Sequence, residues 1–230
     1  MTLWQEAYKM TKTVMLNFAA ALVLIPCAQS ATVQFNMTVD KCTGGCGISP
    51  FATVIVQELS ATQVKITETL ASDNVFAGSG STTRAALYFN ISGLSSLTDI
   101  TIALADTTNF AIGPTPDNLP SFGPFTNSIK CTTCQGGQTT NTAGPLVFTV
   151  TRSAAKGGID VNNFIANANG YYVGSDVASV LAGGSGNTGN VFASANIIAT
   201  TATPEPSTTM MMFGAVALFG AGALRKWRRS

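Results

Sequence analysis

The chain has 230 residues, of which 12 are Lys or Arg and 11 are Asp or Glu; 46% of residues are hydrophobic and only 10% are charged. Such a chain is too apolar to be disordered and carries too few charges for a typical cytosolic enzyme. The absence of histidine excludes Ser-His-Asp catalysis, Cys-His catalysis and every histidine-based metal site. A net charge of +1 provides no basic surface for nucleic acid.

The N-terminal residues 1–30 have the pattern of a secretory signal peptide. A short positive region precedes a mostly apolar stretch at 14–25, and small side chains stand at Ala28 and Ser30, the positions that a signal peptidase reads. This apolar stretch is short for a membrane span. We therefore expect a signal helix that is cleaved after Ser30. The stretch before Met10 is unlike the start of a signal peptide, which makes Met10 a candidate for the true first residue.

The body, residues 31–203, is expected to be one exported domain made of β-structure. It holds six basic and nine acidic residues, and this net charge of −3 disfavours nucleic acid and anionic lipid as partners. Apolar and hydroxyl-bearing residues alternate in several segments, and clusters of Gly, Asn, Pro and Ser separate them. The expected strands are Val33–Val39, Thr53–Leu59, Val64–Leu70, Ala85–Ile91, Ile100–Ala105, Pro145–Arg152, Tyr171–Ser179 and Val191–Ala199.

Short strands with regular turns predict an all-β fold, an antiparallel, jelly-roll-like β-sandwich. The full chain would add an N-terminal signal helix and a C-terminal transmembrane helix to this body. A short β-solenoid is the alternative, but it needs a fixed repeat that the sequence lacks. The segment Asp160–Ala168 is expected to form a short helix or a loop.

Four cysteines remain in the body once Cys27 leaves with the signal peptide, namely Cys42, Cys46, Cys131 and Cys134. An even number of cysteines in an exported domain predicts two disulfides, for which three connectivities exist. The local pairing is the easiest to form, because the glycines at 44–45 let the first loop turn tightly. A crossed pairing would instead tie the first hairpin to the loop near residue 131.

The cysteines also allow two other interpretations. A Cys-x3-Cys pair and a Cys-x2-Cys pair together offer four thiolates, which is a ligand set for zinc. Cys131 and Cys134 also have the spacing of a thioredoxin-like redox pair, which requires a βαβ context and a helix start that this loop lacks. We favour disulfides, and expect neither a metal nor a cofactor.

Few of the carboxylates in the body suggest a catalytic or metal-binding role. Glu68 falls in phase with Val64 and Ile66, and the favoured interpretation is that the inward register ends there, before a buried carboxyl would result. Asp160, Asn162 and Asn163 offer oxygen ligands for calcium, but a solvated turn is the simpler interpretation. A secreted hydrolase that uses two carboxylates needs a facing pair, whose separation one sequence does not reveal.

Tyr171 and Tyr172 are the candidate ligand contacts. Sugar-binding sandwiches commonly stack sugars on aromatic faces, and the body has no tryptophan. Adjacent tyrosines in a strand point to opposite faces, so one belongs to the core and the other is available to a ligand. A carbohydrate-binding module is therefore an alternative function.

The C-terminal residues 204–230 form a three-part pattern. The tetrad comprises Pro204, Glu205, Pro206 and Ser207. A mostly apolar stretch at 208–224, about 17 residues, is just long enough to cross a bilayer as a helix. The basic residues that follow are Arg225, Lys226, Arg228 and Arg229. Basic residues stay on the cytoplasmic side of a membrane, which places the body outside.

The order of tetrad, span and basic tail resembles the PEP-CTERM sorting signal. The resemblance implies processing by an exosortase, a membrane-embedded cysteine protease that removes the anchor after export. It also implies a Gram-negative type of envelope and a link to exopolysaccharide or biofilm.

We therefore expect an exported, non-enzymatic surface or extracellular-matrix protein. Signal peptidase, exosortase and extracellular polysaccharide are its expected partners. Its precursor would be held transiently in the inner membrane, with the body in the periplasm, before release to the cell surface or the matrix.

Overall fold

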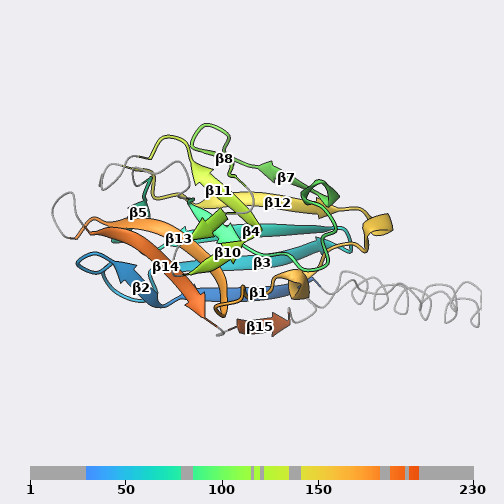
Figure 1. Cartoon of the computed structure of the whole chain (residues 1–230), viewed down its shortest axis with the longest axis horizontal. Helices are drawn as coiled ribbons and strands as arrows, with labels where there is room; N and C mark the ends of the chain where they lie inside the picture. The colour runs from blue at the N-terminus through green and yellow to red at the C-terminus, as the bar shows by residue number, and fades with distance from the viewer. Residues whose placement is uncertain are drawn as a thin grey trace, which may run out of the picture. The chain divides into compact units, whose positions relative to one another are not determined.

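Strands in which apolar side chains alternate with Thr, Gln and Asn build two antiparallel sheets (Figure 1). Sheet A has the strand order β15 (Ile197–Thr201), β1 (Ala31–Met37), β3 (Ala52–Ser60), β4 (Gln63–Leu70), β12 (Leu146–Arg152) and β7 (Ile100–Leu104). Sheet B has the order β2 (Val39–Cys42), β14 (Thr188–Ser194), β13 (Tyr171–Ser179), β6 (Leu87–Phe89), β11 (Asn127–Cys131) and β8 (Phe110–Ile112), with β5 (Asn74–Phe76) also paired to β13.

The computed structural model describes residues 30–78, 85–114, 117–119, 122–134, 141–181, 187–194 and 197–201, which all belong to one compact unit spanning Ser30–Ala202. The predicted signal helix and the predicted transmembrane helix both lie outside these residues. Among the residues that are described, no helix is long and apolar enough to cross a membrane.

The core lies between the two sheets and is built by strict alternation. In β4, Val64, Ile66, Glu68 and Leu70 point inward, while Lys65, Thr67 and Thr69 face outward. The three apolar side chains that point inward join one apolar cluster with residues of sheet B such as Phe89 and Val177. This cluster confirms the all-β, antiparallel sandwich that the sequence predicts.

Several short elements lie outside the two sheets. A two-stranded ribbon is formed by β9 (Asp117–Leu119) and β10 (Gly123–Phe125). Three 3-10 turns are described, η2 (Leu97–Asp99), η3 (Ala154–Lys156) and η4 (Val161–Asn163). The expected short helix or loop at 160–168 is thus a single 3-10 turn followed by irregular chain.

Two expected strands are wrong in their extent. The first, Val33–Val39, covers the end of β1 in sheet A and the start of β2 in sheet B. The run Val191–Ala199 is not continuous, because β14 ends at Ser194 in sheet B and β15 begins at Ile197 in sheet A. β14 pairs with β13 and β2, whereas β15 pairs with β1. The chain therefore crosses from one layer of the sandwich to the other within this run.

Candidate functional site

The outward residues of sheet A form a polar face. Its members are Thr32, Gln34 and Asn36 of β1, Thr53, Ile55 and Gln57 of β3, Gln63, Lys65, Thr67 and Thr69 of β4, Val147, Thr149 and Thr151 of β12, and Thr101 and Ala103 of β7. Lys65 is the only charged residue among them, and it stands in register between Gln57 and Thr149.

Hydrogen bonds fix part of this polar face. The Gln34 amide donates to Asn36 Oδ1 at 2.8 Å, and the Gln63 amide donates to Thr151 Oγ1 at 3.1 Å. Threonine is restricted at χ1, and so it presents its hydroxyl in few orientations. The polar face therefore offers ordered rows of hydroxyl and amide groups to a hydroxyl-rich ligand.

Tyr171 lies in an aromatic cluster on the other side of sheet B from the core. Its half-buried ring packs against Phe192, with ring centroids 4.9 Å apart, and against Phe122 at 6.1 Å. Asn167 supports both ends of this arrangement, because its side chain donates to Phe122 O and accepts the N–H of Tyr171. The cluster thus places an aromatic ring beside amide groups.

Tyr172 has a different environment. Its ring packs against Phe35 of β1, with centroids 5.4 Å apart, and belongs to the edge of the inter-sheet core. The two tyrosines therefore serve different sides of sheet B. Of the two, Tyr171 is the better placed to meet a ligand.

Glu68 corrects the interpretation favoured from the sequence. Strand β4 continues past it to Leu70, and Glu68 points into the core with no exposed surface. Within the described residues, neither of its carboxyl oxygens has a well-formed hydrogen bond. The neighbouring Ser175 hydroxyl donates instead to Ala86 O at 2.5 Å. Burial raises the pKa of the Glu68 carboxyl well above its ordinary value, and Ser175 offsets only part of that rise.

Asp160 caps the 3-10 turn η4. Its carboxylate accepts the N–H of Asn162 at 2.8 Å and of Asn163 at 3.2 Å. The Asn163 side chain accepts the N–H of Asp160 in return, which completes a capping box for η4. These three residues therefore stabilise the turn through hydrogen bonds to one another.

The four body cysteines form the two local disulfides, Cys42–Cys46 and Cys131–Cys134. In this pairing none of the four sulfurs is a thiolate, the form that binds zinc. The glycines at 44 and 45 both have positive φ, 83° and 88°, as the tight first loop requires. The crossed connectivity and the zinc site are thus not the arrangement that the structure shows.

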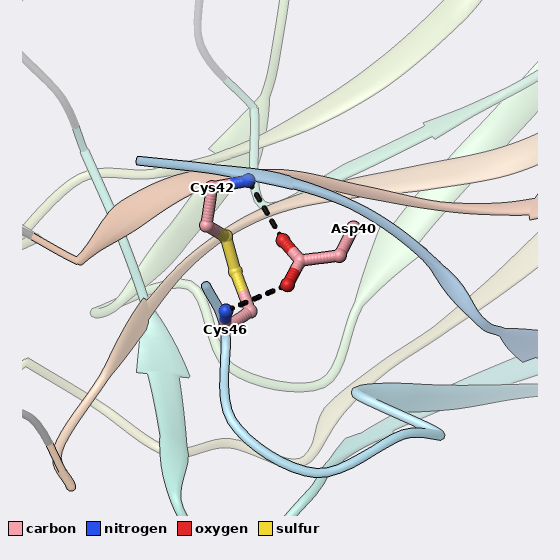
Figure 2. A group of neighbouring side chains, drawn as sticks. All are labelled: Asp40, Cys42 and Cys46. Atoms are coloured by element: carbon pink, nitrogen blue, oxygen red, sulfur yellow. Dashed lines mark hydrogen bonds between the residues drawn. A yellow bond between two sulfur atoms is a disulfide. The ribbon is translucent and has the colours of Figure 1, made fainter. Parts of the chain in front are cut away.

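Asp40 closes the first disulfide loop. Its carboxylate accepts the N–H of Cys42 at 2.8 Å and the N–H of Cys46 at 2.9 Å (Figure 2). The carboxylate and the two sulfurs all lie within 4.8 Å of one another. Sequence spacing gave no sign of this partner, because an acidic residue two positions before a cysteine is unremarkable by itself.

The second disulfide loop follows β11 and is anchored to the turn before β8. Thr132 donates its N–H to Asn109 O at 2.8 Å, and the Thr133 hydroxyl donates to Asn109 Oδ1 at 2.9 Å. The N–H of Cys134 points at the Sγ atom of Cys131, 3.1 Å away. The two loops therefore place their sulfurs in unlike surroundings.

Comparison with known proteins bears on the C-terminal segment alone. No curated protein and no solved structure matches the chain. The model of the PEP-CTERM protein-sorting motif matches residues 202–229, which include the tetrad, the apolar stretch and the basic tail. The motif implies export, a membrane-anchored precursor and exosortase-dependent sorting to the cell surface or the extracellular space. The chain therefore carries a PEP-CTERM protein-sorting motif at residues 202–229.

Proposed function

We propose that the body is a non-enzymatic structural or adhesive component of an extracellular polysaccharide layer. The observation that carries the proposal is the sorting motif at residues 202–229, which accounts for delivery of the body to the outside of the cell. Signal peptidase would process the other end of the precursor, and the body would pass through the periplasm before release.

The polar face of sheet A supports this proposal chemically. A polysaccharide presents many hydroxyl groups along an extended chain, and each needs a hydrogen-bond partner when water is displaced. Rows of Thr, Gln and Asn across neighbouring strands supply such partners repeatedly. With Lys65 as the only charge on the polar face, binding would depend on hydrogen bonds and contact area more than on charge.

Fractionation of cells that make the protein tests the proposal. A double variant, Thr67→Glu with Thr149→Glu, places two carboxylates on the polar face, and we expect its release from the layer into the medium. Lys130→Glu is the control, because it changes charge at an exposed position on sheet B. Equal retention of all three proteins, together with an unchanged layer in cells lacking the protein, would contradict the proposal.

The Tyr171 cluster favours a second function, that of a carbohydrate-binding module. The half-buried ring beside Phe122 and Asn167 offers both a stacking surface and amide groups. Affinity electrophoresis in gels containing the native polysaccharide measures this binding. We expect Tyr171→Ala to lose retardation and Tyr171→Phe to keep it, because the phenylalanine preserves the ring. Tyr172→Phe serves as the matched variant on the core side.

Enzymatic hydrolysis is the least favoured function. Glu68 and Asp176 have no exposed surface, so neither reaches a polymeric substrate in this structure. Incubation of the protein with the polysaccharide, followed by an assay for reducing ends, tests this part of the proposal. A rise in reducing ends that is lost when a body carboxylate is replaced would establish a hydrolase and refute the non-enzymatic proposal.

A further inference from the structure

The two disulfides close loops of similar size but differ in what surrounds the sulfurs. Their sequence separations are 4 and 3, so loop closure stabilises the folded state to a similar extent in both. Any large difference in their reactivity must then come from access to the sulfurs and from how well each site stabilises the thiolate that forms when the bond opens.

The surroundings of Cys42–Cys46 oppose thiol chemistry. Cys46 has no exposed surface. The Asp40 carboxylate lies within 4.8 Å of both sulfurs, and its negative charge disfavours a thiolate at either position (Figure 2). The same charge repels an approaching thiolate. We therefore expect this disulfide to resist reduction.

The surroundings of Cys131–Cys134 favour thiol chemistry. Both cysteines are half-buried, and the two residues between them, Thr132 and Thr133, are exposed. The N–H of Cys134 donates toward the Sγ atom of Cys131 at 3.1 Å, and such a donor stabilises negative charge on that sulfur.

The loop around this second disulfide is also held independently of the sulfur–sulfur bond. Thr132 and Thr133 are both hydrogen-bonded to Asn109 in the turn before β8. The carboxylate of that turn, Asp106, is occupied by the N–H groups of Thr108 and Asn109. The loop can therefore keep its shape after the disulfide opens, and the N–H of Cys134 can keep pointing toward the Sγ atom of Cys131.

We propose that Cys131–Cys134 is a thiol–disulfide exchange site for an external dithiol, whereas Cys42–Cys46 is a structural disulfide. A thiolate of the dithiol attacks Cys134 Sγ, the bond between Cys134 and Cys131 breaks, and its electron pair goes to Cys131 Sγ. The second thiol of the dithiol loses its proton to water and attacks the mixed disulfide, which releases Cys134 as a thiolate that takes up a proton. The dithiol is oxidised to a disulfide, and the protein disulfide is reduced to two cysteines.

Timed reduction of the folded, oxidised full chain with dithiothreitol tests this proposal. Quenching with N-ethylmaleimide and peptide mass spectrometry report each cysteine separately, so Cys27 does not interfere where the precursor is present. We expect Cys131 and Cys134 to be alkylated about tenfold faster than Cys42 and Cys46. Equal rates, or faster reduction of the first pair, would overturn the proposal.

Variants test the two causes separately. Asp40→Asn keeps an oxygen acceptor but removes the charge, and we expect it to speed reduction of Cys42–Cys46 while the other pair is unchanged. Cys134→Ser leaves Cys131 free beside the same backbone N–H, and Cys131→Ser leaves Cys134 free. At neutral pH the first of these should react faster with a thiol reagent. The reverse order, in variants whose circular dichroism matches the wild type, would refute Cys131 as the stabilised leaving group.

Discussion

Replacing Glu68 with glutamine is expected to remove a pH dependence from the stability of the body. Glu68 is fully buried between the sheets without a well-formed hydrogen bond, and burial holds its pKa well above the ordinary value of 4.5. In the unfolded chain the same carboxyl is in water and titrates near that ordinary value. The folded and unfolded states therefore bind different numbers of protons over a range of pH.

The sign and size of the effect follow from this difference. Below a pH of 4.5 both states are protonated, and the folded state keeps its full stability with respect to Glu68. At higher pH the unfolded chain releases the proton while the folded chain keeps it. The free energy of unfolding then falls by about 1.4 kcal/mol per pH unit until the pH passes the raised pKa of the folded state. Each such unit is a sizeable part of a typical domain stability of about 5–15 kcal/mol.

Urea unfolding followed by far-ultraviolet circular dichroism, from about pH 5 to about pH 8, measures this slope. The chain has no histidine and its body cysteines are in disulfides, so neither residue type contributes to this slope. Variants at Glu68 then distinguish it from other buried carboxyls such as Asp176. Glu68→Gln should flatten the slope, and Glu68→Leu should do so while also removing the buried polar group. The control Glu58→Gln, at a partly exposed position on β3, should keep the slope of the wild type.

A wild-type stability that does not change with pH over this range would refute the reasoning about Glu68. So would a folded Glu68→Gln variant that retains the wild-type slope, because the slope would then belong to another group.

Three further predictions concern other parts of the chain. Glu205→Gln in the sorting tetrad should leave an uncut precursor in the membrane fraction, which intact mass spectrometry detects. Replacing Cys131 and Cys134 together with serine should lower the free energy of unfolding by about 2 kcal/mol in urea titrations, the value for so short a loop. Lys156→Ala should destabilise the body near pH 5, because Lys156 holds the pKa of Asp99 below 3.8. The loss should shrink as the pH falls through that lowered pKa, which urea titrations at a series of pH values from 5 downward test.

The long strands of sheet A were predictable because each has one buried and one solvated face. In β4 the alternation of Val64, Lys65 and Ile66 indicates which of these side chains point into the core. The three-residue strands β5 and β8 contain too few residues to show any period. Their existence depends on pairing with later strands, β5 with the distant β13 and β8 with β11.

The boundary between β14 and β15 was not predictable from local pattern. Ser194 and Asn196 interrupt the apolar run from Val191 to Ala199, but they do not show that its two halves join different sheets. The change is decided by partners, since β14 completes a hairpin with β13 and β15 completes the edge beside β1. An apolar strand segment indicates burial without indicating which layer of a sandwich it joins.

The candidate sites differ in the same way: some can be identified from one contiguous stretch of sequence, whereas others form only when the chain folds. The sorting motif can be identified from sequence because its three parts are contiguous and the apolar span and basic tail have the composition of a membrane segment and its cytoplasmic flank. Glu68 was misinterpreted because a carboxyl in phase with apolar residues usually marks the end of a strand, yet Leu70 keeps the same phase beyond it. Likewise, the position of Asp40 beside one disulfide and of a backbone N–H beside the other is a result of loop folding. The reactivity of a short cysteine pair therefore depends on these nearby groups, which the Cys-x2-Cys spacing alone does not specify.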